Sequence, residues 1–188
     1  MNSPAGERDD AALAAAALGG EDAAFTALMR RHKALLYRFV RRYVGDPDEA
    51  LDLVQESFLS AWSALESFDA RRPMPAWLRR IALNKCRDWS RRRRVRAFFF
   101  HAAALDDAAP PSSPAPEAED EAARLHGRLA ALDAAIAALP QALKEPLLLT
   151  AFEGLSHHQA ARLLHLSPMA IETRVYRAKQ ALRRAIAG

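Results

Sequence analysis

Apolar residues recur every three or four positions through most of the chain, which is the spacing of one face of an α-helix. In residues 21–44 this spacing predicts one amphipathic helix, which Gly45 ends. Its apolar positions are Phe25, Leu28, Met29, Leu35, Leu36, Phe39, Val40 and Tyr43. No segment alternates apolar and polar residues with the period of two of a half-buried strand. The pattern therefore predicts an all-α protein.

The next helix is marked by its start signals. Asp46 is a suitable N-cap, Pro47 favours the first turn, and Glu49 follows the cap by three residues. The helix is expected to run to about Ser67, with an apolar stripe formed by Leu51, Val54, Phe58, Trp62 and Leu65. Its opposite face carries Asp48, Asp52, Gln55, Glu56 and Ser60. Such an acidic face is either solvated surface or a docking surface for another protein, and composition leaves both open.

A proline-containing loop over residues 66–75 precedes a third predicted helix over residues 76–94. The expected core stripe of this helix is Leu78, Ala82, Cys86 and Trp89. The other face carries Arg80, Asn84, Arg87, Arg91 and Arg94. A helix that lies along a phosphate backbone needs this division into one anchored side and one side of guanidinium groups.

Charge is concentrated in this part of the chain. Between Arg71 and Arg96 stand eleven basic residues and a single acid, Asp88, so this stretch carries +10 while the whole chain carries +4. Charge of this density repels itself, and a polyanionic partner explains it better than a solvated helix face does. Trp77 opens the helix beside Arg71 and Arg72, where an aromatic ring can stack on an unpaired base. A tryptophan at a helix start is, however, more often part of the core.

The end of the chain predicts a helix-turn-helix. Ser156 is the expected cap of a short helix, and a tight turn at His165 leads to Ser167, which caps a second helix with Pro168 at its first position. The second helix has a buried stripe of Ile171, Val175, Ala178 and Leu182 and another face with Thr173, Arg177, Gln180 and Arg184. A basic, exposed second helix favours insertion into a major groove, although helical hairpins without a DNA-binding function are common. His165 stands where glycine with positive φ is usual, so backbone strain is expected there.

Composition divides the chain into domains. Residues 97–120 contain four prolines and five acids but neither lysine nor arginine, which is typical of a disordered tether. Residues 1–20 form a loose acidic lead-in that is expected to be disordered. From residue 121 the helical pattern resumes, and proline and glycine break it into about four helices. We therefore expect two small helical domains, residues 21–96 and 121–188, joined by a flexible linker.

The composition also excludes several classes of protein. Cys86 is the only cysteine, so the chain forms no intrachain disulfide. No apolar run approaches the roughly 18 residues of a membrane span, and the acids around residues 11–18 argue against a secretory signal, so a soluble, cytoplasmic protein is expected. His157, His158 and His165 lack the cysteines and the spacing of a zinc site. With no nucleophile–base set, metal cluster or phosphate loop, we expect neither enzyme activity nor a cofactor.

Taken together, these stretches resemble the bacterial sigma-70 family, specifically its small extracytoplasmic-function (ECF) group. The similarity covers about residues 21–96 and 128–186. Region 2.2 of the family is similar to the segment DEALDLVQESFLSAW at residues 48–62. Regions 2.3 and 2.4 are similar to AWLRRIALNK at residues 76–85, followed by Asp88 and the arginine run. Region 4 is similar to the segment from Leu139 to Leu182.

The resemblance implies a sigma factor that binds core RNA polymerase, recognises the −35 and −10 promoter elements and promotes DNA melting. It implies that the acidic face docks on the β′ clamp helices through Asp48, Asp52, Gln55 and Glu56. The implied −10 contacts are Arg71, Arg72, Trp77, Arg80, Asn84, Arg87, Arg91 and Arg94. The implied −35 contacts are Ser167, Met169, Ala170, Glu172, Thr173, Arg174 and Arg177. Further implied partners are the β flap of the polymerase and an inhibitory anti-sigma factor.

The chain departs from the family pattern at three places. Pro73-Met74-Pro75 stand where many members have a polar or aromatic stretch, His165 replaces the usual turn glycine, and Glu172 stands where some relatives carry a basic residue. A glutamate in the groove favours accepting a hydrogen bond from a cytosine amino group. The linker acids fit either mimicry of nucleic acid or a solvating spacer. A stand-alone helix-turn-helix repressor is the alternative function, and such a protein binds its operator unaided, usually as a dimer on a palindrome.

Overall fold

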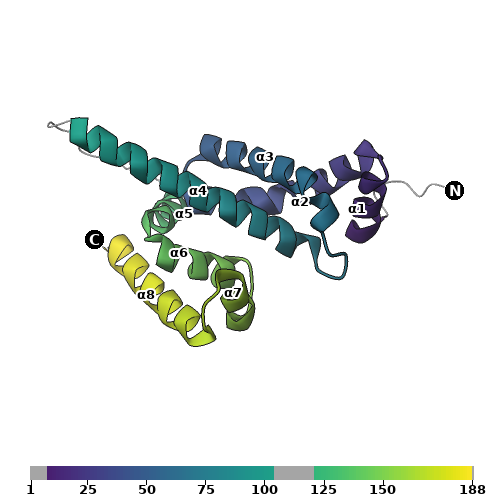
Figure 1. The fold of residues 1–188 in the computed structure, drawn as a ribbon. Coiled ribbons are helices and arrows are strands. Elements are labelled where there is room, and N and C mark those ends of the chain that lie inside the picture. The colour runs from purple at the N-terminus through teal and green to yellow at the C-terminus, as the bar shows by residue number, and fades with distance from the viewer. Residues whose placement is uncertain (1–7, 104–120, 188) are drawn as a thin grey trace. The chain divides into compact units, whose positions relative to one another are not determined.

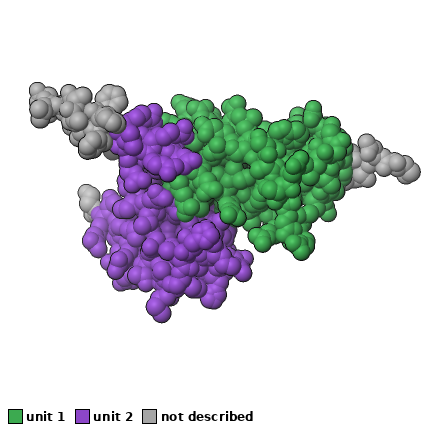
Figure 2. Space-filling model, in the orientation of Figure 1, with its two compact units in different colours: residues 1–87 green, residues 88–188 purple. Residues whose placement is uncertain are grey.

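The structure is a computed structural model that describes residues 8–103 and 121–187 (Figure 1). Within these ranges every regular element is a helix, which confirms the predicted all-α class. The chain divides into two compact units, residues 1–87 and residues 88–188 (Figure 2). The division falls inside the long helix α4. In the described ranges, no helix combines the length and the hydropathy of a membrane span.

The first unit is built around a pair of helices joined by a tight turn. Its elements are α1 (Asp10–Leu18), α2 (Asp22–Val44), α3 (Pro47–Ser63), the 3₁₀ turn η1 (Leu65–Ser67) and the start of α4 (Met74–Ala103). Gly45 ends α2 at φ 85°, and its N–H donates to the Arg41 carbonyl at 2.9 Å. Asp46 Oδ1 then accepts from the N–H groups of Asp48 and Glu49, both at 2.9 Å. These two signals confirm the predicted boundary between the helices.

Helix α1 corrects the prediction that residues 1–20 are disordered. Asp9 caps α1 by accepting from the Ala12 N–H at 2.7 Å, and Leu13 is fully buried where α1 packs on α2. The carboxylate of Asp10 lies 2.7 Å from Arg31 Nη1 and 2.9 Å from Nε2 of the buried His32. Alanine fills most of α1, so its two faces differ little in hydrophobicity and periodicity did not reveal the helix.

Helix α3 is rotated from the predicted apolar stripe. Leu51 is 47% exposed and Trp62 is 42% exposed, although both were predicted to be buried. The buried face consists of Ala50, Leu53, Val54, Ser57, Phe58 and Ala61. Small residues at three of these positions let α3 approach its neighbours closely, so the larger apolar residues at the edge remain partly in solvent. Trp62 still has an edge-on contact with Phe25, with ring centroids 4.8 Å apart.

Helix α4 is longer than predicted at both ends. It begins at Met74 and continues to Ala103, so residues 97–103, which were assigned to the linker, are helical. The reason is that no proline or glycine follows Met74 and Pro75 until Pro110. The predicted core stripe of Leu78, Ala82, Cys86 and Trp89 is buried. The remaining part of the predicted linker, residues 104–120, lies outside the described residues.

The second unit contains the predicted run of helices before the C-terminus. Its elements are the rest of α4, α5 (Glu121–Ala138), α6 (Gln141–Leu147), the π-helical turn η2 (Leu148–Phe152), α7 (His157–Leu164) and α8 (Pro168–Ala187). Helix α8 packs on α5, α6 and α7. Pro146 lies inside α6 and is followed by the wider π turn, because proline has no N–H to continue the regular hydrogen-bond ladder. Ile171, Val175, Ala178 and Leu182 are buried, which confirms the predicted stripe of α8.

Candidate nucleic-acid interface

The basic face of α4 lies where the helical spacing predicts it. Arg80, Asn84, Arg91 and Arg94 are exposed, and Arg87 is half-buried. Arg91 pairs with Asp88, the single acid of the basic stretch. Arg93 stacks over Trp89 with 5.3 Å from its guanidinium carbon to the ring centroid. The helix therefore anchors some of its cations on neighbouring side chains and leaves others, such as Arg80 and Arg94, in solvent.

The loop before α4 holds two of the predicted −10 residues on one carboxylate. Asp69 Oδ1 accepts from both the backbone N–H and the Nε–H of Arg71, at 3.1 and 2.9 Å. Arg72 Nε lies 3.5 Å from the other oxygen of Asp69. The hydrogen bond from the Arg71 side chain is the main cause that lowers the pKa of Asp69 below its ordinary value. Asp69 is therefore charged throughout the physiological pH range.

Trp77 is shared between the core and the surface. Its ring is half-buried and lies 5.3 Å from the Phe68 ring, at an angle of 54°. Phe68 is adjacent to Asp69, so the aromatic pair borders the loop that carries Arg71 and Arg72. The ring is thus partly packed against Phe68 and partly in solvent. Stacking on an unpaired base stays a prediction.

The acidic face of α3 also contains apolar residues that sequence analysis missed. Asp48, Asp52 and Gln55 are exposed, and Glu56 is half-buried with Oε2 4.0 Å from Lys85 Nζ of α4. Leu59 is 62% exposed and follows Asp52 and Gln55 at intervals of four to seven residues, which puts it on the same face. Leu51 lies beside Asp52 and is also exposed. Extending the spacing from Gln55 to residue 59 could have found Leu59.

The helix-turn-helix is fixed by local hydrogen bonds. Ser156 and Gln159 form a reciprocal capping box, with distances of 3.2 and 2.8 Å, at the start of α7. His165 ends α7 in the left-handed region at φ 56° and ψ 47°, which confirms the predicted strained turn. Ser167 Oγ then accepts from the Ala170 N–H at 3.2 Å, so Ser167 caps α8 as predicted.

Helix α8 presents most of the predicted −35 residues to solvent. Ser167, Met169, Glu172, Thr173 and Arg177 are exposed, while Ala170 and Arg174 are half-buried. Sequence analysis missed Tyr176, which is 61% exposed and whose hydroxyl accepts from Gln180 Nε2 at 2.6 Å. Tyr176 follows Met169 and Thr173 at helical spacing and precedes Gln180 by four residues. The same periodicity that selected Thr173 and Gln180 could have selected it.

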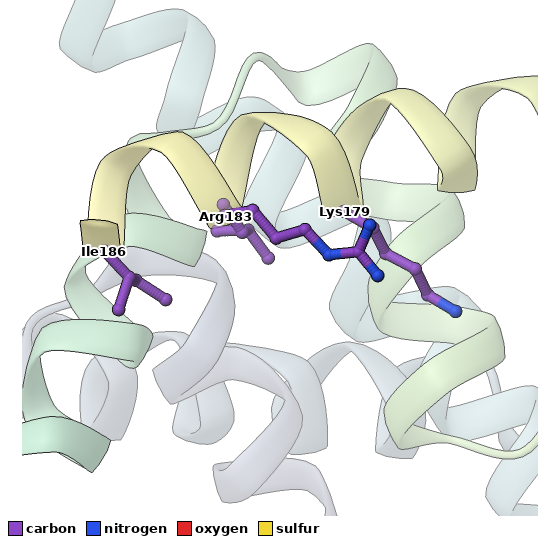
Figure 3. Close-up of a pocket in the computed structure, with 4 residues that line it drawn as sticks. Lys179, Arg183 and Ile186 are labelled. Carbon is purple, nitrogen blue, oxygen red and sulfur yellow. The ribbon is translucent and has the colours of Figure 1, made fainter. Parts of the chain in front are cut away.

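The C-terminal part of α8 has a surface with both cationic and apolar side chains. Lys179, Leu182, Arg183 and Ile186 line a groove there, and the Arg183 side chain extends toward Lys179 and away from the apolar Ile186 (Figure 3). Ile186 is 55% exposed. This combination suits a partner segment that carries both apolar and acidic residues.

Comparison with known proteins decides the family. The model of Sigma-70 region 2 matches residues 28–96, and the model of Sigma-70, region 4 matches residues 129–182. The chain is 41% identical over 174 residues to the RNA polymerase sigma factor NccH of Alcaligenes xylosoxydans xylosoxydans, covering 92% of each chain. It is 30% identical to the ECF RNA polymerase sigma factor SigM of Mycobacterium tuberculosis, covering 95% of this chain and 85% of SigM. The chain is an ECF sigma factor of the sigma-70 family.

The solved structures agree with this assignment. This sigma factor is 40% identical over 181 residues to CnrH of Cupriavidus metallidurans, covering 94% and 93% of the two chains. The structure of CnrH in complex with the cytosolic domain of CnrY superposes with a TM-score of 0.65 at 32% identity, over 95% of this chain and 97% of CnrH.

Family membership confirms the function that the resemblance implied. The sigma factor binds core RNA polymerase, recognises promoter DNA and acts in transcription initiation. Sigma factors are initiation factors and not themselves the catalysts of RNA synthesis. The two matched regions lie one on each side of residues 104–120.

Proposed function

We propose that this ECF sigma factor divides promoter opening among three surfaces, one for polymerase and two for DNA. The observation that supports this division most directly is the separation of charge between α3 and α4. The exposed face of α3 is acidic, that of α4 is basic, and Glu56 and Lys85 lie at 4.0 Å on the boundary between them. Residues 21–96, together with α1, act as the polymerase and −10 module, and residues 121–188 act as the −35 module.

The α3 surface docks on the β′ clamp helices through Asp48, Asp52, Gln55 and Glu56. An acidic face is repelled by DNA phosphates, so its partner is a protein surface with cationic groups. Leu51 and Leu59 are exposed among the acids and provide apolar area that desolvates on docking. A surface of cations alone would leave these leucines unmatched, so we expect the partner surface to be both basic and apolar.

The −10 element meets the loop before α4 and the basic face of that helix. The proposed contacts are Arg71, Arg72, Trp77, Arg80, Asn84, Arg87, Arg91 and Arg94. Extruding a base costs a few kcal/mol, and opening duplex DNA costs about 1.4 kcal/mol per base-pair step. Binding to polymerase and to the −35 element must offset these costs, so the free sigma factor melts no DNA.

The −35 element meets the N-terminal part of α8 in the major groove. The proposed contacts are Ser167, Met169, Ala170, Glu172, Thr173, Arg174 and Arg177. Thr173 and Arg177 are exposed on adjacent turns, as base-reading side chains require. Glu172 is also exposed. Its carboxylate accepts hydrogen bonds but donates none, which favours the amino group of cytosine at its position.

Two further protein contacts are part of the proposal. The groove of Lys179, Leu182, Arg183 and Ile186 offers the β flap a surface with both apolar and cationic groups. CnrH was solved with the cytosolic domain of CnrY, which supports regulation of this chain by an anti-sigma factor. The protein thus works in the cytoplasm, where polymerase and promoter DNA are found, and contributes binding energy without catalysing a reaction of its own.

The experiment that tests the polymerase surface is Asp52→Arg in run-off transcription with purified core polymerase. The variant reverses the charge at the centre of the α3 face, so transcription and co-elution with core enzyme are both expected to be lost. Asp22→Arg makes the same charge change at an exposed position of α2 and should leave both intact. Undiminished transcription by Asp52→Arg rules out the docking role. Tight binding of the unaided chain to a specific operator favours the repressor.

A further inference from the structure

One carboxylate organises the loop that precedes α4. Asp69 accepts three hydrogen bonds from Arg71, one from its backbone N–H at 3.1 Å and two from its guanidinium group, from Nε at 2.9 Å and from Nη2 at 3.2 Å. The side chain of Arg71 is nevertheless 90% exposed, whereas that of Asp69 is 32% exposed. The Nε–Nη2 edge of the guanidinium is therefore held by Asp69, and the rest of the group is in solvent.

This geometry leaves a defined edge of Arg71 for a ligand. A guanidinium has five N–H donors in one plane, and Asp69 occupies one on Nε and one on Nη2. The three remaining donors, including both on Nη1, have no hydrogen bond within the described part of the chain. A planar donor pair in a fixed direction suits two acceptors side by side.

The chemistry of Asp69 selects the kind of acceptor. A DNA phosphate on Arg71 would lie close to the Asp69 carboxylate, and the two negative charges would repel each other. A guanine edge carries two acceptors, O6 and N7, without a net charge, and it is the commonest specific partner of arginine in DNA. The lowered pKa of Asp69 keeps its charge in place at every physiological pH.

Arg72 differs from Arg71 although the two are adjacent. It has a single, longer contact with Asp69, at 3.5 Å, and its side chain is 75% exposed. An arginine with one long contact can turn away from Asp69 by a change of rotamer, so it can meet a phosphate at a distance from the carboxylate. The pair thus divides into one guanidinium held by two hydrogen bonds and one with a single longer contact.

We propose that Asp69 is a positioning residue that holds Arg71 to recognise a guanine in the promoter, while Arg72 contacts phosphate. This inference rests on the proposed function only in that the loop of residues 68–73 meets DNA at the −10 element. It adds the base that is recognised and the residue that aligns the contact. Holding Arg71 in place before binding reduces the conformational entropy lost on recognition.

The test is selection of promoters from a library randomised across the −10 region, with holoenzyme reconstituted from core polymerase and the full chain. The wild type is expected to favour guanine over the other bases at one position by roughly 5- to 100-fold. Arg71→Ala and Asp69→Asn should both reduce this preference to near onefold. Asp69→Glu keeps a carboxylate and should restore part of the preference.

Two variants separate positioning from general effects of charge. Glu66→Gln removes the same negative charge from an exposed position three residues before Asp69 and should leave the preference for guanine unchanged. Arg72→Ala should weaken binding to all sequences alike and leave the base preference intact. In contrast, Asp69→Asn should not weaken average binding to the library, because it removes a negative charge beside DNA.

The outcomes distinguish this inference from the proposed function. A preference for guanine that survives in Asp69→Asn overturns the positioning role. A second outcome is that Arg71→Ala weakens binding to all sequences equally and changes no preference for guanine. That result overturns base recognition but still places the loop at the DNA. Full binding by the double variant of Arg71 and Arg72 to alanine means that the loop does not contact DNA, and the proposed function of the loop then fails.

Discussion

At the scale of single residues, His165 shows how the protein tolerates strain at a turn. It is the single non-glycine residue with positive φ among the described residues, at φ 56°. The left-handed region costs a residue with a Cβ roughly 1–2 kcal/mol, and glycine avoids this cost while it adds entropy to the unfolded chain. His165→Gly is therefore expected to raise the free energy of unfolding by about 0.5–1 kcal/mol. Urea denaturation of the full chain, followed by circular dichroism, measures this change.

A matched histidine provides the control for this prediction. His158 is also exposed but lies in the first turn of α7, where the backbone is regular. His158→Gly should lower stability by a few tenths to about 1 kcal/mol, since glycine disfavours helix. If both variants change stability in the same direction, the strain at His165 is not the cause.

The residue scale also shows what the sequence could and could not predict about the site. Helical spacing correctly identified the exposed positions Asp52, Arg80 and Thr173. Each residue of an α-helix is rotated by about 100° from the one before it, so position in the sequence fixes the face on which a side chain lies. The contact of Asp69 with Arg71 was not predictable in this way. It depends on the backbone path of a loop, which has no period, and on a hydrogen bond to a main-chain N–H.

At the scale of elements, α1 is an integral part of the first unit. Leu13 is 0% exposed, whereas Leu18 on the same helix is 51% exposed. Leu13→Ala removes a buried side chain and is expected to destabilise the fold by about 2–5 kcal/mol. Leu18→Ala should change the free energy of unfolding by less than about 0.5 kcal/mol. Guanidinium denaturation of both variants measures the difference.

Other results for Leu13→Ala would contradict this role of α1. If both leucines prove equally dispensable, α1 is not held against α2 in solution and residues 1–20 behave as the disordered lead-in that composition suggested. An intact pair of Asp10 with His32 in the Leu13→Ala variant would show instead that polar contacts alone keep α1 in place. The pair can be followed through the NMR signals of the His32 ring.

Element boundaries were predictable where a residue imposes them chemically. Asp46, Ser156 and Ser167 each accept from a helix N–H, and Gly45 adopts a φ that other residues avoid, so each signal acts locally. The prediction was wrong for α1 because its alanines give no strong apolar stripe, although Asp9 and the pair Gly19-Gly20 mark its two ends. It was wrong for the end of α4 because acidic, proline-rich composition was extended back over residues 97–103, although the first proline of that stretch is Pro110.

At the scale of the whole molecule, the distribution of charge matters more than its sum. The chain carries a net charge of +4, but residues 71–96 alone carry +10, so the rest of the chain carries a net charge of −6. A protein with this distribution is attracted to DNA most strongly at the basic stretch and repelled at its acidic faces, which orients it on approach. The acidic α3 face is repelled by phosphates, which is consistent with its proposed role as the polymerase surface.

This distribution predicts how promoter binding responds to salt. Each arginine that neutralises a phosphate releases counterions, so removing it reduces the slope of log K against log[salt] by about 0.7–0.9. Arg80→Gln and Arg94→Gln, both exposed on α4, should each reduce the slope for holoenzyme on promoter DNA by this amount. Arg30→Gln changes an exposed arginine of α2, outside the basic stretch, and should leave the slope unchanged. Equal slopes for all three variants would mean that long-range attraction by net charge, and not contact between α4 and phosphates, accounts for the affinity.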